Sequence, residues 1–164
     1  MAIVKKNIPN ISIEGARIGF RNFAGKEGKY NAKGNRNFCL FLDNDLADKL
    51  TEDGWNVRWL QPRDEGDTSQ AYLSVNVKFG DYPPKITMIT SRGQTILDEE
   101  SVDVLDWAEI ATVDLIVRPY TWEIGGKQGV KGYLKSLYIQ IVENEFEKKW
   151  ANGPIDVDSN DESY

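Results

Sequence analysis

Short runs of β-branched and aromatic residues recur along this chain, and turn-forming residues separate them. Such spacing is typical of an all-β sandwich or barrel, whose short strands follow one another through tight turns. The expected strands are 11–23, 36–43, 56–61, 71–79, 85–90, 95–97, 111–122 and 132–142. We therefore predict a mainly β fold.

Two short helices are expected between these strands. The first begins at Asp43 or Asn44, either of which suits a helix N-cap, and Gly54 ends it. The second follows Asp98, because the two acidic residues after it suit a helix N-terminus. Segments 24–35, 62–70 and 125–129 are expected to be loops.

The length indicates one domain followed by a tail. With 164 residues, of which 40% are hydrophobic, the chain has apolar material for one core. We assign residues 1–150 to that domain. Residues 151–164 have few large apolar side chains, so we expect a disordered acidic C-terminal tail. Its candidate partner-binding residues are Asp156, Asp158, Asp161, Glu162 and Tyr164.

Two further features concern the cellular compartment. No apolar run approaches the roughly 20 residues that a membrane helix needs, and the first residues lack a secretory signal, so we expect a cytoplasmic protein and no membrane partner. The single cysteine, Cys39, lies in the apolar run NFCLFLD and is expected to be a buried hydrophobe.

The net charge of −6 is unevenly distributed. Residues 1–36 carry eight Lys and Arg and two acids, whereas residues 37–110 carry six basic and fifteen acidic residues. The last fourteen residues contain four acids and no base. A chain polarised in this way is compatible with a polyanion bound at its positive face.

The two expected C-terminal strands carry aromatic and basic residues on one face. Alternation points Val113, Leu115 and Val117 to one side and the intervening side chains to the other. Rings interleaved with cations suit sequence-tolerant binding of single-stranded nucleic acid, because bases stack on rings while cations follow phosphates. The candidate residues are Arg118, Tyr120, Trp122, Lys127, Lys131, Tyr133 and Lys135. The alternative is that these rings cover one end of the core.

The apolar residues Leu137, Ile139 and Ile141 have the same alternation as Tyr133. The side of the last strand that carries Tyr133 must therefore change from exposed to buried along its length. A β-bulge or strand coiling would allow this change. Pro119 also fits a bulge or an edge position, because proline cannot donate to a β-ladder.

A second candidate surface is the basic, glycine-rich N-terminal stretch. Its loop could fold over a strand of nucleic acid, and the alternative is an ordinary solvated hairpin. The residues concerned are Arg17, Arg21, Lys26, Lys29, Tyr30 and Arg36. We expect Trp55 and Trp59 to be core or barrel-lip residues.

Catalytic chemistry has little support in the sequence. The chain contains no histidine, which removes the commonest general base, and we expect no catalytic residue, cofactor or metal. The acids Asp43, Asp45 and Asp48 leave open a Mg²⁺-dependent nuclease, although aspartates are also expected at a helix start. A protein-interaction or virion-assembly module is the other alternative.

From Met88 onward the features follow a distinctive order. A hairpin turn is followed by a helical connection, a strand ending in P-Y-x-W, a glycine-containing loop, a long strand and an acidic tail with a terminal aromatic residue. These elements are Ser91-Arg92-Gly93, Asp98 to Glu109, Pro119 to Trp122, 125–129, 131–143 and Asp156 to Tyr164. This order resembles the single-stranded DNA-binding proteins of lytic podophages, a bacteriophage family.

The resemblance implies a single OB-fold-type β-barrel that binds single-stranded DNA without marked sequence preference. It also implies a tail that recruits the phage DNA polymerase and primase-helicase, in the host bacterial cytoplasm, during DNA replication, recombination and repair. A homodimer is left open. The tail is shorter and less acidic than is usual in the family, and the first half of the chain matches only in pattern.

Overall fold

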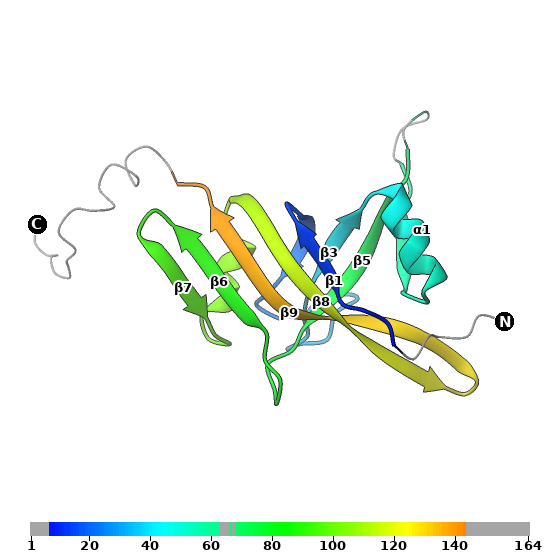
Figure 1. Ribbon diagram of the computed structural model, residues 1–164. Coiled ribbons are helices and arrows are strands. Elements are labelled where there is room, and N and C mark those ends of the chain that lie inside the picture. The colour runs from blue at the N-terminus through cyan, green and yellow to red at the C-terminus, as the bar shows by residue number, and fades with distance from the viewer. Residues whose placement is uncertain (1–6, 63–65, 67, 144–164) are drawn as a thin grey trace, which may run out of the picture.

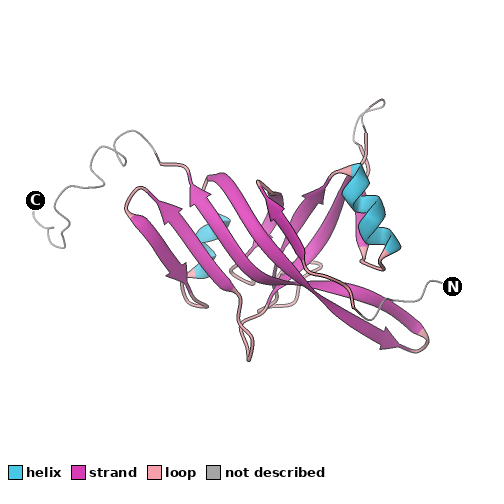
Figure 2. Cartoon of the chain, in the orientation of Figure 1, coloured by secondary structure: helices cyan, strands magenta, loops and turns pink. Residues whose placement is uncertain are grey.

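The computed structural model of the protein describes residues 7–62, 66 and 68–143 (Figure 1). Strands make up most of this part of the chain (Figure 2), which confirms the mainly β prediction. In chain order the elements are β1 (Ile11–Glu14), β2 (Arg17–Asn22), β3 (Arg36–Leu42), α1 (Asn44–Glu52), β4 (Val57–Leu60), β5 (Gln70–Val77), β6 (Lys85–Thr90), β7 (Gly93–Leu97), the 3-10 helix η1 (Val102–Asp106), β8 (Ile110–Ile124) and β9 (Lys127–Ile141).

Six strands form one curved path in the order β1-β8-β9-β5-β3-β2. Neighbours along it are antiparallel, except that β5 and β9 are parallel. The two ends of the path, β1 and β2, are consecutive in the chain and separated by Gly15 and Ala16. The sheet therefore curls into a partly open barrel.

The expected strand 11–23 is wrong in one respect, because it is two strands. The chain turns at Gly15, whose φ is 66° and whose N–H donates to Oδ1 of Asp114 at 2.9 Å. β1 then pairs with β8, whereas β2 pairs with β3. One straight strand cannot serve both ends of a curled sheet, and glycine adopts the left-handed turn conformation without strain.

β9 runs through the centre of the molecule beside the long strand β8 (Figure 1). β5 borders the first half of β9, and β6 borders its second half. β4 extends the sheet from β5, and β7 extends it from β6.

A β-bulge in β9 confirms the expected change of parity. Val117 pairs with Leu134 and Ile116 pairs with Ser136, which leaves Lys135 as the extra residue. Leu134 is buried before the bulge and Leu137 after it. Pro119 lies beyond the end of β1, whose pairing with β8 stops at Val117, so its missing N–H disrupts no bond of that ladder.

The core fills the barrel with aliphatic and aromatic side chains. The rings of Phe23 and Phe38 are stacked with centroids 5.3 Å apart, and both residues are fully buried. Trp55 is a core residue, whereas Trp59 is 41% exposed. Cys39 corrects our expectation, because it lies only half-buried on the outer face of β3. Strand alternation places it opposite to the core residues Phe38 and Leu40.

The helices partly match the predictions. α1 begins after Asp43, whose Oδ1 accepts a hydrogen bond from the Leu46 N–H at 2.8 Å. The segment after Asp98 forms the short 3-10 helix η1 instead of an α-helix. The expected loop 125–129 shrinks to a two-residue turn at Gly125 and Gly126, both with positive φ, as tight hairpins require.

The expected tail, with its candidate residues Asp156, Asp158, Asp161, Glu162 and Tyr164, lies outside the described residues, as does the domain boundary at residue 150. Within the described ranges, no helix combines the length and apolar character needed to cross a membrane.

Candidate nucleic-acid interface

The hairpin of β8 and β9 presents aromatic and basic side chains on one face. Val113, Leu115 and Val117 are buried, as their parity predicts. On the opposite face, Arg118 pairs with Tyr133 and Tyr120 pairs with Lys131 across the two strands. Trp122 pairs with Gly129, and alternation places Lys127 on the same face. The structure therefore brings the residues of the first candidate set together, with Lys135 exposed in the adjoining bulge.

The rings on this face contact one another and the cations beside them. The ring centroids of Tyr120 and Tyr133 are 5.8 Å apart, and Arg118 Cζ lies 5.1 Å from the Tyr133 centroid. The Trp122 ring lies against the backbone of Gly129, so close that a β-carbon there would come within 2.8 Å of the ring. These rings are thus held on the ribbon in defined positions.

The same face continues from β9 onto β5 and β3. Tyr133 is in register with Asn76 of β5, so their side chains lie on one side of the sheet. Further along β5, Tyr72 lies between Phe41 of β3 and Arg58 of β4 in a cross-strand row. Asn76, Tyr72, Phe41 and Arg58 are absent from both candidate sets. Alternation in 36–42 and 70–77 would have placed Phe41 and Tyr72 outside, because their neighbours in the chain form the core.

Two hollows mark the middle of this face and share Asn76, Lys131 and Tyr133. The larger, about 650 Å³, is also lined by Cys39 and Tyr72. Burial raises the pKa of the Cys39 thiol. The smaller hollow, about 430 Å³, extends to the end of β5 and the start of β3. Together the hollows extend over the outer face of β3, β5 and β9.

The loop 24–35 is organised from inside by Asn31. Its Nδ2 donates to the carbonyl oxygens of Lys26, Ala32 and Asn35, and its Oδ1 accepts from Asn37. These bonds hold the loop in shape while its tip stays open.

Tyr30, at that tip, is 91% exposed and lines the larger hollow. The Lys29 ammonium lies 5.4 Å from the Tyr30 ring centroid. The structure therefore places these two residues of the second candidate set at one side of the face.

The remaining residues of that set are divided between two places. Arg17 lies over the Phe41 ring at 5.7 Å, and Arg36 lines the smaller hollow. By contrast, Arg21 donates to the carbonyl oxygens of Leu105 and Ala108, both at 2.7 Å. Lys26 lies 4.3 Å over the ring of Trp107, which follows η1. Arg21 and Lys26 thus contact the segment around η1 and are separate from the others.

Phe20 occupies an irregular place in β2. Its φ is 48°, and it lies where β2 has one more residue than β3, between Gly19 and Asn22. After the inward-facing Ile18, regular alternation would bury Phe20, but this bulge leaves it 67% exposed. Its ring lies edge-on to Phe41 at 6.2 Å, so the bulge adds an exposed ring to the face.

The part of the chain that the structure describes contains no group of three His, Cys, Asp or Glu side chains that could hold a metal ion. Asp43, which the nuclease alternative would use, caps α1.

The order of the path, with its one parallel pair, defines the class of protein. Because β1 and β2 together act as one kinked strand, the path is that of a five-stranded OB-fold barrel. A family model described as a putative phage ssDNA-binding domain matches residues 1–162. The chain therefore belongs to this family of phage single-stranded DNA-binding domains, as the resemblance implied.

Comparison with solved structures supports the fold. The single-stranded DNA-binding protein of bacteriophage Enc34, truncated at its C-terminus, has a TM-score of 0.52 and 10% identity over 88% of this chain and 97% of that chain. The same phage protein without that truncation gives 0.50 and 11% over 90% and 87%. No curated protein matches the sequence.

Proposed function

We propose that this protein binds single-stranded DNA across the outer face of β3, β5, β9 and the β8–β9 hairpin. The observation that carries the proposal is the continuity of this face, on which exposed and partly exposed rings lie beside cations. Bases would stack on Tyr72, Tyr133 and Tyr120, while Arg58, Lys131 and Arg118 would lie along the backbone phosphates.

The chemistry of this face favours binding without strong sequence preference. Every base has a π-face, and each base stacked on a ring contributes about 1–3 kcal/mol. In the OB fold, the strands that correspond to β3 and β5 and the loops at 24–35 and 125–126 are those that bind oligonucleotides. The family membership of the chain supports the same ligand.

In the cell, such a protein would act by stoichiometric coating of unpaired DNA in the cytoplasm of the phage's host. Coating removes hairpins and protects strands from nucleases during replication, recombination and repair. We further propose that the acidic tail recruits the phage polymerase and primase-helicase. That part rests on the resemblance and on the four acids in residues 151–164.

The test is a fluorescence titration of the protein with oligo-dT and with a matched duplex, at low and moderate salt. Quenching of tryptophan emission would report stacking. We expect salt-sensitive binding that selects the single strand, with equal or higher affinity in a version ending at Trp150, because the tail no longer competes. Absence of binding to oligo-dT at low salt would refute the proposal.

The tail is tested separately, by binding of the full chain and of the shortened version to the purified phage polymerase. We expect only the full chain to bind. Equal binding by both versions would refute the recruiting role and leave DNA binding unaffected.

A further inference from the structure

The smaller hollow of the face is basic at its rim. The segment 34–36 forms one side, the end of β5 forms another, and Lys131 and Tyr133 of β9 form the third. Arg36, Lys78 and Lys131 line it, and Glu99 is the one acid among its lining residues. A hollow of about 430 Å³ with three cations is large enough for a phosphate group.

Arg36 is positioned in this hollow but weakly bonded. Its Nη1 lies 3.5 Å from Glu99 Oε2, and its Nη2 donates to the Glu99 carbonyl oxygen at 3.4 Å. Both distances are at the long end for a hydrogen bond. The guanidinium lies over the Phe79 ring at 5.5 Å, and Nε is buried without a partner among the described residues. A donor is therefore left unused beside a weak ion pair.

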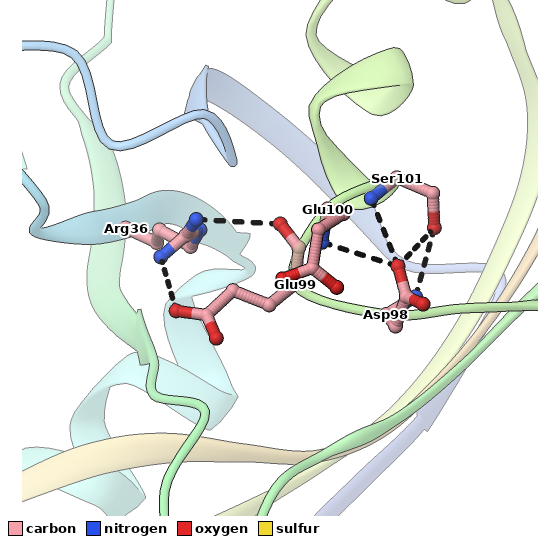
Figure 3. A network of polar contacts seen from close by, with 5 residues as sticks. All are labelled: Arg36, Asp98, Glu99, Glu100 and Ser101. Carbon is pink, nitrogen blue, oxygen red and sulfur yellow. Dashed lines mark hydrogen bonds and ion pairs between the residues drawn. The ribbon is translucent and has the colours of Figure 1, made fainter.

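The turn of Asp98 to Ser101 fixes the backbone of Glu99 but not the Glu99 side chain (Figure 3). Oδ1 of Asp98 accepts hydrogen bonds from the Glu100 N–H and from both the N–H and the hydroxyl of Ser101, at 2.8–3.1 Å. These bonds lower the pKa of Asp98, and the bond from the Ser101 hydroxyl contributes most. The Asp98 carboxylate that holds the turn therefore stays ionised. The Glu99 side chain is 52% exposed and can turn away.

We propose that this hollow is a site for a backbone phosphate of single-stranded DNA and that the Glu99 carboxylate occupies Arg36 until the DNA displaces it. The inference rests on the proposed function, because it assumes that the strand crosses this face. A carboxylate and a phosphate both accept from a guanidinium, so they compete for the same donors. Glu99 would then keep Arg36 ordered in the free protein and reduce the affinity for DNA.

The test compares Glu99→Gln with Glu100→Gln in oligo-dT titrations over a range of salt concentrations. Both changes remove one negative charge, but only the first removes a contact with Arg36. We expect Glu99→Gln to raise the affinity about two- to fivefold, the factor that corresponds to a partly exposed ion pair. We expect Glu100→Gln to change it little at moderate salt, because that charge is screened.

A double-mutant cycle with Arg36→Met tests whether the effect of Glu99→Gln on affinity depends on Arg36. Arg36→Met should weaken binding, and Glu99→Gln should then have no larger effect than Glu100→Gln. Because Arg36→Met also alters a largely buried side chain, thermal unfolding checks its fold. A second readout, which needs no variant at this position, is the Nε–H resonance of Arg36. It should shift on adding oligo-dT and in the Glu99→Gln protein.

The outcomes separate the two proposals. No binding of oligo-dT by the unaltered protein would refute the proposed function and this inference with it. If the protein binds but Glu99→Gln matches Glu100→Gln or lowers affinity, the role of Glu99 is refuted and the proposed function stands. A gain from Glu99→Gln that persists in the Arg36→Met background would also refute it.

Discussion

The ring of Tyr120 on β8 lies 5.8 Å from the ring of Tyr133 on β9, with 37° between their planes. The two residues are diagonal neighbours, since Tyr133 pairs with Arg118 and Tyr120 pairs with Lys131. Each ring therefore lies next to a cation on the partner strand. This cluster joins the hairpin to the part of the face on β5, and it is where we expect the first bases to stack.

Replacement of Tyr120 with Ala should weaken oligo-dT binding about 5- to 150-fold, because one stacking platform of about 1–3 kcal/mol is lost. The double variant with Trp122→Ala should bind more weakly still. Tyr138→Ala is a matched control, since this half-exposed tyrosine lies on β9 beyond the bulge, opposite Asp114. Titration by tryptophan quenching measures the affinities. Unchanged affinity in a folded double variant would contradict the site.

Arg21 and Lys131 should behave differently when replaced with Met. Arg21→Met should lower the free energy of unfolding by about 3 kcal/mol, because two short hydrogen bonds from a charged donor to Leu105 and Ala108 are lost. Lys131→Met should leave stability nearly unchanged but reduce the slope of log affinity against log salt by about 0.7, the value for one phosphate contact. Urea unfolding and salt titrations measure both. A reduced salt slope for Arg21→Met would show that it contacts DNA.

The rate at which Cys39 is alkylated should change when DNA binds. Cys39 is the only cysteine of the chain, and it lines the larger hollow. Since burial raises its pKa, the thiolate fraction near neutral pH is smaller than for an ordinary thiol. The rate with N-ethylmaleimide should therefore start low and increase as the pH rises through the raised pKa. At fixed pH, saturating oligo-dT should slow the reaction, whereas the matched duplex should not. Free cysteine serves as the reagent control.

Phe20→Gly should raise the free energy of unfolding by about 1 kcal/mol. A bulky residue at positive φ costs about 1–3 kcal/mol, and glycine adopts that conformation freely, although it adds chain entropy to the unfolded state. Phe20→Ala is the control, because it loses the ring and keeps the strain. It should be no more stable than the unaltered protein. Urea denaturation distinguishes them, and a loss of stability in Phe20→Gly would mean that the ring contact with Phe41 outweighs the strain.

The sequence predicts the candidate site best where alternation within a single strand is enough to place a side chain on one side of the sheet. The parity of Tyr120 and Trp122 follows from Val113, Leu115 and Val117, the buried residues that precede them in the same strand and have the opposite parity. Tyr72 is absent from both candidate sets, although the same alternation in 70–77 places its side chain outside the core. Arg21 could not be assigned from the sequence, since its partners on Leu105 and Ala108 are remote in the chain.

The sequence by itself determined the mainly β fold, most strand positions, the N-cap of α1 and the change from an exposed to a buried face along the last strand, because these depend on neighbouring residues. Only the tertiary structure decided that Gly15 divides the first strand and that β5 lies parallel to β9. It also decided that Glu99 meets Arg36. The physical reason is that strand order and side-chain pairing arise from long-range contacts, whose partners no local pattern specifies.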